Sequence, residues 1–91
     1  MRRVKLAWDY FSSGLWELDP HDGIWVAIEP RELPLSSDLQ SEIRHWAEAQ
    51  TVAYNGTEPV SDEARAEWRE RASALVERLR KELGDDVHVE A

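Results

Sequence analysis

Side chains able to bind a metal or carry out acid–base chemistry are scattered along this 91-residue sequence. The three histidines fall at His21, His45 and His88, without HExxH spacing, and cysteine is absent. Asp19, His21 and Asp22 form the one local cluster of potential ligands, but the backbone demands of a turn explain that composition. Because a metal site needs three or four converging ligands, we expect no metal and no cofactor.

Catalytic motifs are equally missing from the sequence. The GxSxG, Walker and GxGxxG patterns are absent, and most serines stand at expected helix caps and turns. A pair of carboxylates carries little information in a chain with 19 acidic residues. No nucleophile, base and orienting group can be placed together, so we predict that the protein is not an enzyme.

The net charge of the chain limits the kinds of partner that it can bind. Nineteen acidic residues against 11 basic ones give a net charge of −8, and residues 6–30 contain no lysine or arginine. Phosphate binding takes clustered basic side chains, so we expect neither nucleic acid nor an anionic membrane as a partner. A basic protein would be attracted, although an acidic surface that only keeps the protein soluble explains the same composition.

Five tryptophans stand out in a chain of this length. Trp8, Trp46 and Trp68 fall on apolar stripes and are expected in the core. Trp16 and Trp25 lie on two predicted strands either side of a turn, where they either form an interaction surface or only shield an exposed sheet face.

The turn between those strands adds acids to the two aromatic side chains. The sequence therefore predicts a partner-binding surface made of Trp16, Glu17, Asp19, Asp22 and Trp25.

Periodicity predicts the elements that position this surface. Val4, Leu6, Trp8 and Tyr10 recur every second residue, as in a half-buried strand. Further strands are expected at residues 15–18, 24–28 and 87–89. Because residues 24–28 are all apolar, that strand is expected either to be covered on both faces or to be weakly specified in register.

Two helices are expected between the third and fourth strands. The first spans residues 37–54, capped by Ser36 or by Ser37 with Gln40, and the second follows the cap Ser61 and ends at Gly84. The order βββααβ predicts an α+β fold, with both amphipathic helices packed on one face of a small, mostly antiparallel sheet. If every connection reverses the chain, the last strand lies antiparallel beside the first.

Residues 1–91 are expected to form a single α+β domain, since this length supports one hydrophobic core. The first residues lack the uninterrupted apolar run of a signal peptide, no stretch is long enough to span a membrane, and the absence of cysteine removes any need for oxidation. We expect a cytoplasmic protein.

Several short motifs resemble a family of short, largely uncharacterised bacterial proteins. They are Lys5-Leu6, Asp9-Tyr10, Leu15-Trp16, Pro30-x-x-Leu33-Pro34-Leu35-Ser36 and Trp46-Ala47, in the pattern KL..DY...LW followed by P..LPLS..L...I..WA. Gly14 stands where the family pattern has proline. The resemblance implies an α+β fold and a likeness to immunity proteins of bacterial toxin systems.

Together these features predict an acidic protein-binding module, an immunity or inhibitor protein that binds and blocks a basic toxin or effector domain. The alternative is a phage-type inhibitor that mimics DNA and occupies a nucleic-acid-binding protein. That alternative requires rows of acids along the second helix, where glutamates in fact alternate with arginines.

Overall fold

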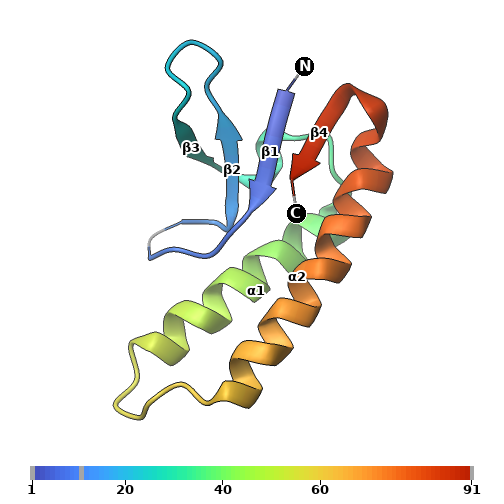
Figure 1. Ribbon diagram of the computed structural model, residues 1–91. Helices are drawn as coiled ribbons and strands as arrows, with labels where there is room; N and C mark the ends of the chain where they lie inside the picture. The colour runs from blue at the N-terminus through green and yellow to red at the C-terminus, as the bar shows by residue number, and fades with distance from the viewer. Residues whose placement is uncertain (1, 11, 91) are drawn as a thin grey trace.

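The computed structural model describes residues 2–10 and 12–90, and its elements follow the predicted order. Both long helices lie against one face of a four-stranded sheet, so the molecule has two layers (Figure 1). The elements are β1 (Arg2–Leu6), β2 (Leu15–Leu18), β3 (Trp25–Ile28), the 3-10 turn η1 (Pro30–Glu32), α1 (Ser37–Tyr54), α2 (Asp62–Leu83), the 3-10 turn η2 (Gly84–Asp86) and β4 (Val87–Glu90). This is the predicted α+β fold.

The sheet has the order β3-β2-β1-β4 and is mixed. β1, β2 and β3 form an antiparallel meander, whereas β4 lies parallel to β1, with Arg2 opposite Val87 and Val4 opposite Val89. The expected position of the last strand is confirmed, but its expected antiparallel direction is wrong. The connection from β3 to α1 passes behind β1 without reversing the chain (Figure 1). α1 and α2 then run in opposite directions and η2 turns the chain back into β4, so β4 takes the direction of β1.

The first strand ends earlier than the alternation predicts. β1 stops at Leu6, and the chain then leaves the sheet towards α1. There the Trp8 ring stacks on Tyr54 with centroids 4.7 Å apart, and its Nε1 donates a hydrogen bond to Thr51 Oγ1 at 3.0 Å. The alternation therefore reflects the contact of Trp8 with α1 and the contact of Tyr10 with Trp8, and not a continuation of the strand.

The third strand is an edge strand, which corrects the expectation of cover on both faces. Only β2 pairs with β3 among the described residues, and Ile24 and Val26 are 59% and 49% exposed. The helices cover β1, β4 and the start of β2, where Val4, Val89 and Leu15 are buried, but they do not reach the outer strand (Figure 1).

Both helices begin at a serine cap. Ser36 Oγ accepts the Leu39 amide of α1, and Ser61 caps α2 in the same way, so the Ser37 alternative is wrong. Ser36 also donates through its backbone N–H and its hydroxyl to the Glu82 carboxylate, at 2.6 and 2.9 Å. A side chain near the end of α2 thereby holds the start of α1.

The core lies between the sheet and the helix pair. Its buried side chains come from three strands, the connector and both helices: Val4, Leu15, Leu33, Leu35, Leu39, Ile43, Trp46, Ala47, Leu75, Val76, Leu79, Leu83 and Val89. The predicted helix stripes supply the larger share of this set, and burial of each large aliphatic side chain contributes about 1.5–3 kcal/mol. The β2–β3 hairpin projects beyond this core.

Candidate partner-binding surface

The structure divides the five predicted binding residues between the two faces of the hairpin and its turn. Residues opposite each other in the ladder share a face, so Trp16 shares one with Ala27, and Trp25 with Leu18. These side chains lie on the outer face, which we define as the sheet face turned away from the helices. Glu17 lies on the helix-side face, opposite Val26 and in the same row as buried Val4.

Trp16 and Trp25 therefore point outward on the same face, and both are half-buried. The Trp16 indole donates from Nε1 to the Ala7 carbonyl at 2.9 Å, which fixes its ring against the end of β1. Lys5 of β1 lies on the same face, with Nζ 4.5 Å from the Trp25 ring centroid. The cation–π contact orders Trp25, and the hydrogen bond to Ala7 orders Trp16, so both aromatic side chains of the outer face are fixed in place.

Glu17 is neutralised by a base from another strand. Arg2 Nε and Nη2 donate to its two carboxylate oxygens at 2.7 and 2.9 Å. These hydrogen bonds hold the pKa of Glu17 below its ordinary value and raise the pKa of Arg2. A segment without lysine or arginine in sequence is thus not free of bases in space, because β1 brings Arg2 and Lys5 beside it.

The turn after β2 is built around Asp19. Its Oδ1 accepts the His21 amide at 2.8 Å, and its carbonyl accepts the Gly23 amide at 2.8 Å. Gly23 adopts a φ of +68°, which L residues rarely adopt. Asp22 is exposed, and no described side chain forms an ion pair with it. Asp19 therefore shapes the turn while Asp22 presents a free carboxylate.

A shallow hollow of about 340 Å³ lies beside this turn, on the part of the hairpin that extends past the helices. It is lined by Glu17, Leu18, Asp19, Pro20, Val26 and Ile28. Its aliphatic floor and the Asp19 carboxylate suit the side chain of a lysine or arginine, whose apolar stem and cationic end match those two parts, whereas Glu17 is already paired with Arg2.

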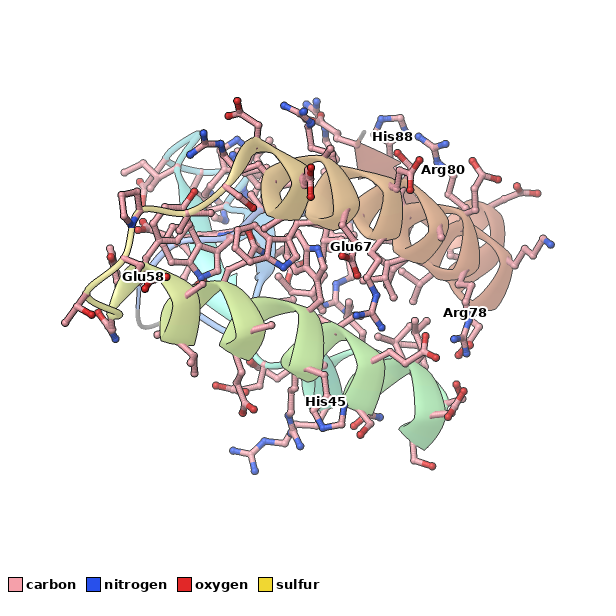
Figure 2. All side chains as sticks on the ribbon, turned by 90° about the horizontal axis from the view of Figure 1, so that it is seen from below. His45, Glu58, Glu67, Arg78, Arg80 and His88 are labelled. Atoms are coloured by element: carbon pink, nitrogen blue, oxygen red, sulfur yellow. The ribbon has the colours of Figure 1, made fainter. Side chains whose placement is uncertain are left out.

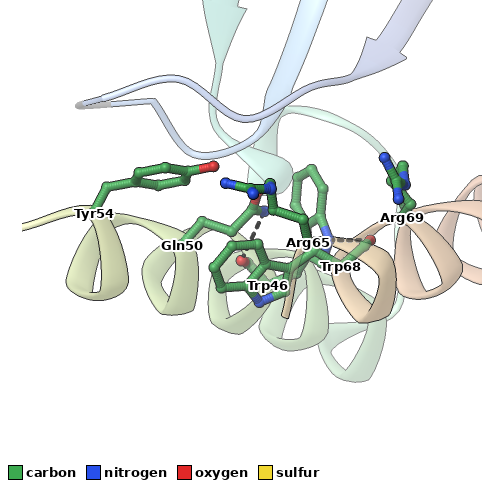
Figure 3. Close-up of a pocket in the computed structure, with 7 residues that line it drawn as sticks. Trp46, Gln50, Tyr54, Arg65, Trp68 and Arg69 are labelled. Atoms are coloured by element: carbon green, nitrogen blue, oxygen red, sulfur yellow. Dashed lines mark hydrogen bonds between the residues drawn. The ribbon is translucent and has the colours of Figure 1, made fainter. Parts of the chain in front are cut away.

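A second hollow, which the sequence did not predict, lies between the helices at the end far from the hairpin. It measures about 220 Å³ and is lined by Trp46, Gln50, Tyr54, Arg65, Trp68, Arg69 and Ala72. Figure 3 shows Arg65 of α2 pointing towards the Tyr54 hydroxyl of α1. Trp46 is buried as expected and donates from Nε1 to the Trp68 carbonyl at 2.9 Å, whereas Trp68 is half-buried and lines the hollow instead of the core.

Arginines pair with acids along the second helix. Arg65 and Arg80 bind Asp62 and Glu77, each three residues away. Arg78 lies among three acids, Asp38, Glu42 and Glu82 (Figure 2 labels Arg78 and Arg80). The side-chain hydrogen bond to Asp38 is the main reason that the pKa of Arg78 is raised. The unbroken rows of free acids that DNA mimicry requires are therefore interrupted on α2.

The histidines are dispersed in space as well as in sequence. His45 projects from α1 on one side of the molecule and His88 lies on the other, beyond α2 (Figure 2), while His21 sits in the β2–β3 turn. Within residues 2–10 and 12–90, no three histidine or acidic side chains come close enough to hold a metal ion. No helix in the same ranges is long and apolar enough to cross a membrane.

Comparison of the sequence with known protein families gives a match over nearly the whole chain. A family described as Serratia CdiI immunity protein-like matches residues 2–90. The same comparison with individual curated proteins finds none that matches this chain.

Proposed function

The chain belongs to the Serratia CdiI immunity protein-like family, and from this we propose that it is an immunity protein that binds a toxin domain and blocks it. Blocking requires only a complementary surface, so we propose an inhibitor without catalysis of its own. Since the fold contains no cysteine and needs no oxidising compartment, we place its action in the cytoplasm.

The observation that carries the proposal is the projecting hairpin. β2 and β3 extend beyond the helices and combine the ordered Trp16–Trp25 patch with an exposed acid, Asp22, at the turn. Tryptophan is enriched at the energetic centres of interfaces, and acids at the rim steer a basic partner. The net charge of −8 favours a basic toxin domain over an acidic one.

Growth neutralisation tests the proposal directly. The proteins encoded by the genes on either side of the one for this chain are each expressed in a laboratory bacterium, as separate domains, alone and together with this chain. We expect one of these domains alone to arrest growth, and co-expression to restore growth and yield a purified complex. Continued arrest in the presence of folded, soluble chain would contradict the proposal.

Charge reversal tests the placement on the hairpin. Replacing Glu17, Asp19 and Asp22 together by lysine should slow association with the neutralised domain and flatten its dependence on salt, because exposed charges steer diffusional encounter. The matched control makes the same change in net charge by reversing three exposed acids of α2 that form no ion pair with any described residue, Glu63, Glu67 and Glu70. Equal rates for both triple variants would rule out the hairpin as the steering surface.

A further inference from the structure

β3 presents an open backbone edge on the proposed binding hairpin. The Asp19 amide donates to the Ile24 carbonyl at 2.8 Å, which sets the alternation of the β2–β3 ladder. Residues 24, 26 and 28 therefore direct their backbone groups towards β2, and Trp25 and Ala27 direct theirs away from it. No strand among the described residues lies beyond β3.

The side chains of this edge do nothing to protect it. Residues 24–28 carry no charge and no proline, and Ile24 and Val26 are among the exposed large apolar residues. The opposite edge differs, because β4 carries His88 and Glu90, and Arg80 of α2 donates to the Val89 carbonyl at 3.1 Å. Proteins normally blunt free edges with charges, prolines or covering side chains, so of these two edges β3 is the one left ready to pair.

Charge decides between a second copy of this chain and a different partner. The turn before β3 carries Asp19 and Asp22, and Glu29 and Glu32 with Arg31 follow β3, so both ends of the strand are net negative. A second copy paired through β3 places acidic ends beside acidic ends in either direction. An incoming strand with an apolar centre and basic flanks avoids that repulsion.

The hollow beside β3 fits the same occupant. Val26 and Ile28 form part of its floor, and Asp19 contributes a carboxylate. A lysine or arginine on a strand added beyond β3 would lay its stem on these apolar side chains and its charge beside Asp19.

We propose that β3 is a docking strand, and that the toxin domain adds an extended segment with basic flanks to the sheet along the backbone of Trp25 and Ala27. In this mode main-chain hydrogen bonds hold the segment and neighbouring hollows select its side chains. The inference rests on the proposed immunity function and specifies how the same hairpin carries it out.

Ala27→Pro tests the open edge selectively. Proline removes an N–H that points away from β2, so the β2–β3 ladder keeps its bonds while the incoming strand loses a donor and meets the pyrrolidine ring. Ala27→Thr is the matched control, because it keeps the N–H and favours a strand. The probe is the toxin domain neutralised in the growth assay, with affinity measured by calorimetry and amide protection by hydrogen exchange.

We expect Ala27→Pro to weaken binding by about tenfold or more and Ala27→Thr to leave it nearly unchanged. The amides of Trp25 and Ala27 should gain protection from exchange on binding. If Ala27→Pro does not fold, Val26→Lys replaces it, because the lysine keeps the backbone intact and sets a like charge against the basic flanks of the incoming strand. Val26→Gln is then the control.

Three results would overturn the inference. If a toxin is neutralised and its affinity for Ala27→Pro equals its affinity for the native chain, the immunity function is retained and the docking strand is ruled out. A free chain that dimerises, with Ala27→Pro abolishing the dimer, assigns the edge to a second copy. If no toxin is neutralised at all, the proposed function fails first, and the docking strand with it.

Discussion

Gly14 lies just before β2 and packs against Trp46 and Ala47 of α1, so we expect a methyl group added there to lower the stability of the fold. The residue is buried, has a φ of +96°, and leaves little space for a side chain: a Cβ would lie 3.2 Å from Trp46 Cζ3 and 3.4 Å from Ala47 Cβ. Trp46 is only 5% exposed and its indole is held by the Trp68 carbonyl, so its ring has little freedom to move.

The cost of Gly14→Ala has two parts. A positive φ costs an L residue about 1–2 kcal/mol, and forcing a methyl group into a packed core costs about 1–3 kcal/mol. We expect the free energy of unfolding to fall by about 2–5 kcal/mol, a large share of the roughly 5–15 kcal/mol typical of a domain. Gly23→Ala isolates the first part, because Gly23 has a φ of +68° and a Cβ added there would meet no other atom within 4 Å.

Urea unfolding followed by tryptophan fluorescence measures both variants. The midpoint should drop for each, with an unchanged slope, and Gly14→Ala should lose about 1–3 kcal/mol more than Gly23→Ala. Equal losses would refute the reasoning, since they would mean that the Trp46 ring gives way without cost. A Gly14→Ala variant as stable as the native chain would refute both parts.

Two further predictions concern contacts outside the core. The pKa of Glu17 is lowered in the folded chain, so its pairing with Arg2 stabilises fully above the unfolded pKa of about 4.3 and is lost as pH falls through the lower folded value. The stability advantage of the native chain over Glu17→Gln, measured by urea unfolding from about pH 6 to pH 3, should therefore shrink with acid, and a constant difference would contradict the ion pair. Trp8→Phe should lower the free energy of unfolding by about 1 kcal/mol, because it removes the hydrogen bond to Thr51. Adding Thr51→Val to that variant should cost little more, whereas losses of stability that are fully additive would show that the bond contributes nothing.

Periodic patterns predicted the helices best. The stripe through Leu39, Ile43 and Trp46 and the serine caps located both helices within about a residue, because a helix on a core must repeat its apolar positions about every 3.6 residues. Alternation was less specific in the first strand. Trp8 and Tyr10 continue the period of two although Trp8 contacts a helix and Tyr10 contacts Trp8, since the pattern records apolar character and not the element that is contacted.

Direction and neighbours across the sheet lay beyond the sequence pattern. The parallel direction of β4 depends on the path of the connector before α1, and no residue type in the sequence predicts that path. Trp16 and Trp25 could be placed on one face from alternation alone, but Arg2 and Lys5 reach the hairpin through pairing in space. The proline of the family pattern cannot occupy position 14 in this conformation, because proline holds φ near about −65° and Gly14 has +96°.

The pairing of β1 with β4 has a consequence for biosynthesis. Arg2 lies opposite Val87, so β1 waits for its second neighbour while the 85 residues that separate them are translated, which takes about 4–17 s at ribosomal rates of about 5–20 residues per second. A hairpin such as β2–β3 closes within about 1–10 μs once its residues have emerged. The β2–β3 hairpin thus precedes the layer that supports it, and a ribosome that stalls before residue 87 releases a chain whose Val4 face lacks the cover of Val89. Exposed apolar surface of this kind makes a chain prone to aggregation, so the proposed function requires that β4 has been synthesised.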